Sequence, residues 1–151
     1  MTRIDLHAHV VTDAYRELLV TPDGTRPFVV PAPLEGLEAN MARYAIDAAV
    51  ISLGPPGAFL GDQGRANEIA RAGNESIAAI VQAAPARFAG LALLPLPDVD
   101  AAVAELTARG VRFLHYDQPP TDETGVMRAG GPLIAWFSDP AGNVFSVIEQ
   151  S

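Results

Sequence analysis

Two histidines near the amino terminus, His7 and His9, are the residues of this sequence best suited to chemistry. They stand two positions apart in an alternating segment, residues 3–10, so on a strand both imidazoles point to one face. Neutral imidazole nitrogens bind zinc, iron, nickel or manganese. Asp5 shares that face and can orient one ring through its second nitrogen. The spacing predicts part of a metal site, with two surface histidines as the plainer alternative.

His115 is a candidate for a third ligand or for an outer partner of the first two. It lies near the end of a predicted strand at residues 111–116, and parallel strands bring their carboxyl ends to one edge of a sheet. A partly exposed strand histidine is the simpler interpretation. Asp117 and Asp139 are weaker candidates of the same kind, and Asp139 also fits a turn.

Five further residues have a structural role as their simpler explanation. Asp62 precedes a predicted helix and fits an N-cap. Arg65 and Arg71 can bind a substrate carboxylate, but solvated helix arginines are commoner. Trp136 and Phe137 are neighbours on a late strand, where one of the two should face the core and a ligand platform is the less common arrangement.

Helices and strands in alternation are expected to position these side chains. Apolar periods of three and four predict helices over residues 34–46, 63–84 and 99–109. Alternating or short apolar runs predict strands over residues 3–10, 48–53, 88–94 and 111–116. This order predicts four parallel strands with helices packed against them.

The pattern changes after residue 117. Residues 132–137 and 144–148 read as two strands joined by the short turn 138–143, in which Pro140 fixes φ and Gly142 tolerates positive φ. Strands joined by so short a turn are antiparallel. The expected fold class is therefore α/β, with a partial barrel of parallel βα units followed by a C-terminal antiparallel hairpin.

Composition excludes several classes of function. The net charge of −8 repels phosphate backbones, so nucleic acid is not expected as a partner. The absence of cysteine excludes disulfides and thiolate metal sites. No apolar segment approaches the ~20 residues that cross a bilayer, and the amino terminus lacks the pattern of a signal peptide. We expect no membrane association and a cytoplasmic location.

Four motifs together carry a resemblance to a known family. They are IDLHAH at residues 4–9, ARAGNESI at 70–77, PARF at 85–88 and LPLPD at 94–98. Residues 1–106 thereby resemble the amidohydrolase superfamily, and within it the branch of aminocarboxymuconate-semialdehyde decarboxylase. The resemblance implies a divalent ion, often zinc, on His7 and His9. It also implies either hydrolysis of amide-like bonds or nonoxidative decarboxylation of a small carboxylated substrate.

The family completes its metal site with residues from the second half of a barrel. A full (βα)₈ barrel takes about 250 residues, more than this chain of 151 residues holds. We therefore expect a half barrel with an unclosed edge, and a homodimer that can supply missing ligands.

The C-terminal part resembles a second family. The motifs GVRF at residues 110–113 and FSDPAGNV at 137–144 are similar to the vicinal oxygen chelate family of glyoxalase and bleomycin-resistance proteins, over residues 98–150. In that family's metal-bound members a carboxylate occupies the position of Ser146, so this resemblance implies ligand binding without metal.

The two resemblances predict a fusion of a truncated amidohydrolase-like region, residues 1–106, with a partial chelate-family region, residues 107–151, packed as one compact domain. The first functional hypothesis is a metal-dependent hydrolase or decarboxylase acting on a small molecule. The alternatives are a non-catalytic small-molecule-binding module and an inactive remnant of recombination, natural or artificial.

Overall fold

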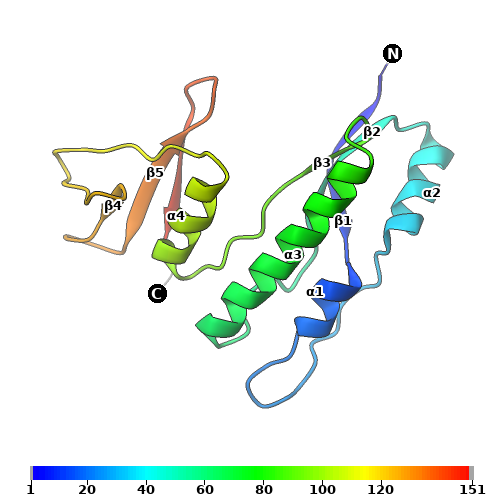
Figure 1. Ribbon diagram of the computed structural model, residues 1–151, viewed down its shortest axis with the longest axis horizontal. Helices are drawn as coiled ribbons and strands as arrows, with labels where there is room; N and C mark the ends of the chain where they lie inside the picture. Colours follow the sequence, from blue (N-terminus) through cyan, green and yellow to red (C-terminus); the bar gives the residue numbers. More distant parts are fainter. Residues whose placement is uncertain (1, 150–151) are drawn as a thin grey trace. The chain divides into compact units, whose positions relative to one another are not determined.

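The chain forms two compact units, Met1–Leu93 and Leu94–Ser151, in a computed structural model that describes residues 2–149. Each unit has its own sheet (Figure 1). Each unit also has its own hydrophobic core. Among the described residues, no helix combines the length and the apolar character needed to cross a membrane.

The first unit is built on a parallel sheet of three strands in the order β1-β2-β3. The strands are β1 (Ile4–Val10), β2 (Ala48–Leu53) and β3 (Phe88–Gly90), and the helices are α1 (Asp13–Leu18), α2 (Leu34–Tyr44) and α3 (Gln63–Ala83). The β-α order along the chain is the one that the sequence predicts up to this point.

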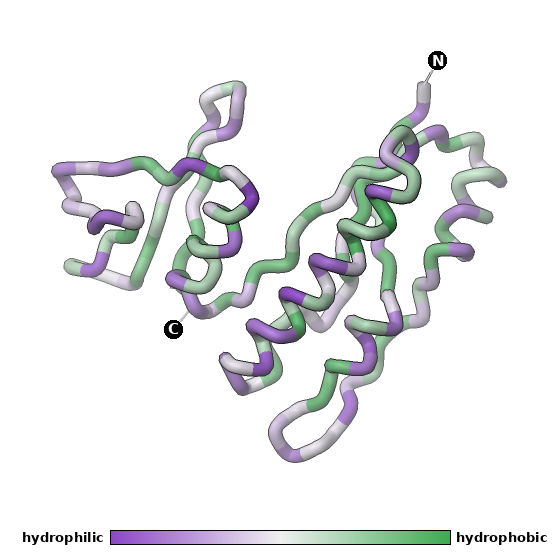
Figure 2. The backbone as a smooth tube through the Cα atoms, viewed as in Figure 1, coloured by the Kyte–Doolittle hydropathy of each residue, from purple (hydrophilic) through white to green (hydrophobic). Residues whose placement is uncertain are grey.

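One face of this sheet is buried against helices α2 and α3. Ala8 and Val10 of β1, Ile51 of β2 and Phe88 of β3 belong to one buried cluster with Met41 of α2. Figure 2 shows hydrophobic and hydrophilic residues alternating along α3, as expected for a helix with one buried face. Because side chains alternate along a strand, His7 and His9, which flank the buried Ala8, are left for the opposite face.

Helix α3 lies very close to β3. A Cβ atom added at Gly90 would come within 2.5 Å of the Ile77 side chain. Asp62 is the N-cap of α3, and its carboxylate accepts a hydrogen bond from Arg65 N at 2.7 Å, which confirms the predicted cap.

The second unit packs α4 (Val99–Ala108) against an antiparallel sheet in the order β4-β5-β6. The strands are β4 (Val126–Met127), β5 (Ile134–Ser138) and β6 (Val144–Ile148). Its core consists of six buried residues: Val99, Ala102, Val103, Val126, Ala135 and Val147. The predicted hairpin is confirmed in β5 and β6, and Asp139 serves its turn by accepting from Asn143 N at 2.8 Å.

The prediction of a fourth parallel strand at residues 111–116 is wrong. Phe113 instead forms an antiparallel bridge with Phe137 of β5, and Leu114 N donates to the Trp136 carbonyl at 2.7 Å. The parallel strand at residues 88–94 is also shorter than predicted, because β3 ends at Gly90.

The division between the units also falls earlier than the predicted boundary at residue 106, and the chain forms two compact units rather than one. The physical reason is that α4 buries its apolar side against β5 and β6, so the helix belongs to the second unit.

Candidate metal centre

His7 and His9 project from the face of β1 opposite the buried cluster, and both side chains are exposed. Their Nε2 atoms lie 3.1 Å apart, with ring centroids separated by 4.7 Å and planes at 78°. Two nitrogens that each lie about 2.0–2.1 Å from one ion must be less than about 4.2 Å apart. The two rings meet this condition, so the residues present fit a divalent metal.

Ser52 holds the ring of His9 from the neighbouring strand. Its Oγ lies 3.0 Å from His9 Nδ1, and β1–β2 pairing places the two residues side by side. When Nδ1–H donates to this hydroxyl, the lone pair of Nε2 is free for a metal. The sequence analysis missed Ser52, although its position near the end of a predicted parallel strand was a usable signal.

The structure places the Asp5 carboxylate against the backbone of His7, and its predicted role as a partner of an imidazole ring stays a prediction. Its carboxylate accepts a hydrogen bond from the backbone N–H of His7 at 3.0 Å. The same segment contains a bulge, because the register with β2 shifts between Asp5 and Ala8. A bulge leaves a backbone N–H without its ladder partner, so Asp5 stabilises the backbone that carries His7.

The loop after β2 lies directly beside His9. A Cβ atom at Gly54 would be 3.7 Å from the Cβ of His9. The buried Tyr15 hydroxyl fixes this loop: it lies 2.9 Å from the Gly54 carbonyl oxygen and accepts from Gly57 N at 3.1 Å. Burial raises the pKa of Tyr15, so the hydroxyl stays protonated and able to donate.

Asn74 fixes the chain beyond β3 at the same end of the sheet. Its amide Nδ2 donates to the Leu93 carbonyl at 2.9 Å, and its Oδ1 accepts from Leu93 N at 2.7 Å. Asn74 is 3% exposed. The asparagine of the 70–77 motif therefore positions backbone rather than substrate.

The other predicted candidates occupy structural positions or the second unit. Arg65 donates to the Leu18 carbonyl at 3.1 Å and pairs with Glu68. His115 belongs to the second unit, where it lines a cavity, and its role as a further ligand stays a prediction. Within residues 2–149, no group of three or more His, Cys, Asp or Glu side chains is arranged to hold a metal.

Parallel βα units with imidazoles on the first strand define the architecture of amidohydrolase-type barrels, and comparison with known proteins agrees with this class. No known family profile matches the chain. A curated relative, 6-methylsalicylic acid decarboxylase from Aspergillus aculeatus, is 32% identical over 128 residues, which is 77% of this chain and 39% of the relative.

Solved structures of amidohydrolase-type proteins are also similar to this chain. An amidohydrolase II protein is 28% identical with a TM-score of 0.59, over 70% of this chain and 36% of its own. A dihydroxybenzoic acid decarboxylase from Polaromonas, solved with manganese and an inhibitor, is 30% identical with a TM-score of 0.55, over 70% and 33%. The chain thus spans little more than a third of the length of the proteins it matches.

These similarities support the predicted resemblance to amidohydrolase-fold decarboxylases and a partial barrel. They do not show the resemblance of the C-terminal part to the vicinal oxygen chelate family, which stays a prediction.

Proposed function

We propose that this chain takes part in metal-dependent, nonoxidative decarboxylation of a small carboxylated aromatic molecule, with His7 and His9 as metal ligands. The observation that carries the proposal is the 3.1 Å separation of the two Nε2 atoms on one strand. Between the hydrolysis and decarboxylation that the motifs imply, decarboxylation is favoured because two of the similar proteins are named as decarboxylases.

The two imidazoles would hold the ion, and Ser52 would keep Nε2 of His9 turned toward it. A bound divalent ion polarises carboxylate and hydroxyl oxygens of a substrate. The loop fixed by Tyr15 limits the movement of the backbone beside His9. In the overall reaction the bond from the ring carbon to the carboxylate breaks, carbon dioxide leaves, and the ring carbon takes up a proton.

The identity of the metal is a finer proposal. Imidazole suits zinc and manganese alike, and manganese is the ion in the similar Polaromonas structure. We propose zinc as the first ion to test, because the motifs resemble a branch in which zinc is frequent.

The test combines metal binding with turnover on the untagged full chain, so that no polyhistidine tag competes for metal. Loss of 2,6-dihydroxybenzoate or 6-methylsalicylate is followed with and without added zinc or manganese. His7→Ala and His9→Ala should each weaken metal binding by at least about 100-fold and abolish metal-dependent turnover.

Leu6→Ala is the matched control, because Leu6 directly precedes His7 on the same strand and is 71% exposed. It should bind metal as the unchanged chain does. Equal metal binding by the chain and by both histidine variants would overturn the proposal.

A second candidate function is small-molecule binding by the second unit without metal. A cavity of about 600 Å³ in this unit is within the size range of ligand sites. Its lining combines apolar Val103 and Phe113 with the cationic side chain of Arg112 and with His115. Benzoate should then shift the amide NMR signals of Arg112 and His115 in the His7→Ala variant; unchanged signals at millimolar benzoate would exclude this candidate.

A further inference from the structure

We propose that Tyr15 is a positioning residue for the metal centre. Its hydroxyl holds the loop of residues 54–57, and this loop together with the end of β2 holds the imidazole of His9 where it meets His7. The proposal rests on the metal-binding part of the proposed function. It adds a residue that touches neither the ion nor the substrate and that acts through the backbone.

Three backbone groups of one short loop converge on the Tyr15 hydroxyl. The carbonyl oxygens of Gly54 and Gly57 lie 2.9 and 3.0 Å from Oη, and Gly57 N donates to Oη at 3.1 Å. A hydroxyl has one proton and two lone pairs, so it can donate to a carbonyl and accept from an N–H at once. A phenylalanine ring in the same place would satisfy none of these groups and would face two carbonyl dipoles.

Tyr15 itself is held firmly by helix α3. The residue is 0% exposed and belongs to a buried cluster with Ala66 and Ile69 of that helix. The N-cap of α1 is also tied to α3, because Thr12 Oγ1 lies 2.9 Å from Ser76 Oγ. The hydroxyl is therefore a fixed point to which the loop is attached.

The loop meets β1 on the face that carries the metal ligands. A Cβ atom at Gly54 would lie 3.7 Å from His9 Cβ and 3.9 Å from Val11 Cγ2. Val11 follows His9 by two positions, and its backbone N–H donates to the Ala32 carbonyl at 2.7 Å. Because the chain just beyond β1 is held in this way, a shift of the loop would change its contact with His9 directly.

The segment from Ser52 to Gly54 reaches His9 at two points. Ser52 Oγ lies 3.0 Å from Nδ1 of the ring, and Gly54 lies beside the Cβ atom. Both contacts help to keep the Nε2 atoms of His9 and His7 at their separation of 3.1 Å. Metal ligands must be held within about 0.5 Å of their working geometry. Releasing the loop from Tyr15 should therefore lower metal affinity.

The experiment compares Tyr15→Phe with the unchanged, untagged full chain. The variant keeps the buried ring and removes only the hydroxyl. Without metal, we expect the Gly57 N–H to lose hydrogen-exchange protection and the ring nitrogen NMR signals of His9 to shift, while those of His115 in the second unit stay unchanged.

With metal, the zinc affinity of Tyr15→Phe should fall about three- to tenfold, since a direct partner of a metal ligand contributes about tenfold or more. The visible absorption bands of cobalt bound in place of zinc should also shift. A residue that only stabilised the fold would not change these bands in a chain that circular dichroism shows to be folded.

Tyr44→Phe is the matched control, because it makes the same chemical change on a side chain of α2 that is 57% exposed. It should change neither the ring signals nor the zinc affinity. Gly54→Ala tests the contact between the loop and His9 independently of Tyr15. The added methyl group should shift the His9 ring signals without loss of protection at Gly57.

The results separate this inference from the proposed function. A folded Tyr15→Phe variant with unchanged Gly57 protection, unchanged His9 signals or unchanged zinc affinity overturns the inference. If that variant does not fold, unchanged His9 signals in Gly54→Ala overturn the inference and shifted signals support it. A chain that binds no zinc overturns the proposed function, while the signals of the metal-free chain still decide whether Tyr15 positions His9.

Discussion

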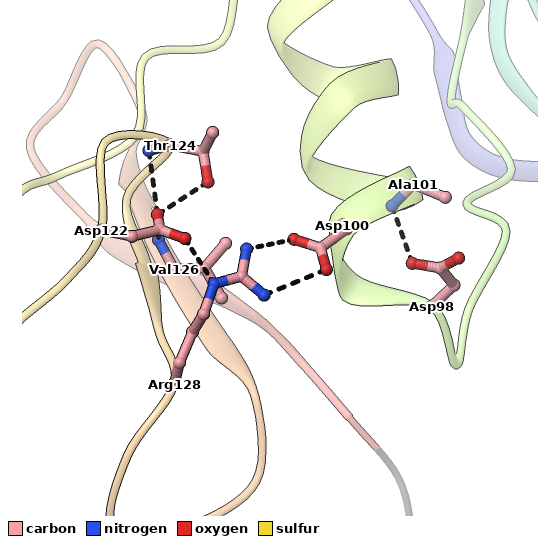
Figure 3. A network of polar contacts seen from close by, with 7 residues as sticks. All are labelled: Asp98, Asp100, Ala101, Asp122, Thr124, Val126 and Arg128. Carbon is pink, nitrogen blue, oxygen red and sulfur yellow. Dashed lines mark hydrogen bonds and ion pairs between the residues drawn. The ribbon is translucent and has the colours of Figure 1, made fainter.

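One cluster of polar side chains in the first unit differs from one in the second unit in whether its members neutralise each other. In the first unit, His7 and His9 point at each other on an exposed face, and among residues 2–149 no carboxylate forms a hydrogen bond or ion pair with either ring. In the second unit, the guanidinium of Arg128 lies between two carboxylates (Figure 3). Its Nη2 lies 2.6 Å from Asp100 Oδ1, and its Nε is bonded to Asp122.

The network in the second unit is internally neutralised. Partial burial acts to raise the pKa of Asp122, but hydrogen bonds from Thr124, Val126 and Arg128 outweigh it and hold that pKa well below the usual value. Hydrogen bonds to Asp100 and then to Asp122 raise the pKa of Arg128 above its usual value. Groups that satisfy one another in this way stabilise a fold.

This difference indicates which of the two units is better suited to bind an ion. Lone pairs that converge without a neutralising partner can bind an ion, whereas a cation held by two carboxylates has little left to offer a ligand. The first unit is accordingly the place to expect function, and the second unit's charged residues the place to expect stability. The predictions below separate these two roles.

The largest effect on stability should come from Asn74→Ala. The change leaves the N–H and C=O of half-buried Leu93 without their hydrogen bonds to Asn74, whose own side chain is buried. We expect the first unit to lose about 2–3 kcal/mol of unfolding free energy. Hydrogen exchange with mass spectrometry reports each unit separately, and only peptides from Met1–Leu93 should lose protection.

Asn67→Ala is the matched control on the same helix. Asn67 accepts a bond from Gln63 one turn earlier and is only partly buried, so its loss should cost less than about 1 kcal/mol. Equal losses in the two variants would contradict the role assigned to Asn74.

Ser52→Ala should affect metal binding and leave stability unchanged. Without the hydroxyl, the ring of His9 loses the partner that fixes its tautomer. Removing such an outer partner weakens metal affinity by about tenfold. Isothermal titration with zinc measures the affinity, and Ser138→Ala in the second unit serves as the control that should not change it. A full loss of folding in Ser52→Ala would show a structural role instead.

Arg128→Gln should destabilise the second unit alone. It removes the ion pairs to Asp100 and Asp122, but both pairs are partly exposed, so we expect a loss of only about 1 kcal/mol. Trp136, the single tryptophan, lies in β5 and reports unfolding of this unit by fluorescence. Arg109→Gln, which breaks a helical pair with Glu105, should cost less. If Arg128→Gln also changed the metal affinity, the assignment of metal binding to the first unit and of this network to stability alone would be wrong.

The sequence predicts the parts of this molecule that depend on local pattern. The shared direction of His7 and His9 follows from strand periodicity, and the cap at Asp62 follows from residue type beside a helical stripe. The hairpin of β5 and β6 follows from its turn residues. Each of these features is decided within a few residues along the chain.

Features that depend on distant partners were not predictable in the same way. An apolar segment such as residues 111–116 suits a parallel or an antiparallel neighbour, and only the presence of β5 decides between them. Helix α4 likewise can cover either sheet, so the division between the units could not be placed from its own residues. The contact of Asp5 with the backbone of His7 could not be predicted, because the alternation predicts no bulge.

The smallest expected effect is the loss of stability of the second unit in acid. The pKa of Asp122 is lowered in the folded state, so between that value and the unfolded value of about 3.9 the unfolded chain binds more protons. The contribution is therefore complete above about pH 5 and is lost as pH falls through the folded pKa. We expect Trp136 fluorescence to show the second unit less stable at pH 3 than at pH 6 by up to about 1 kcal/mol from this group. Asp122→Asn should reduce that pH dependence, since an amide does not titrate; an unchanged slope would assign the acid sensitivity to other carboxylates.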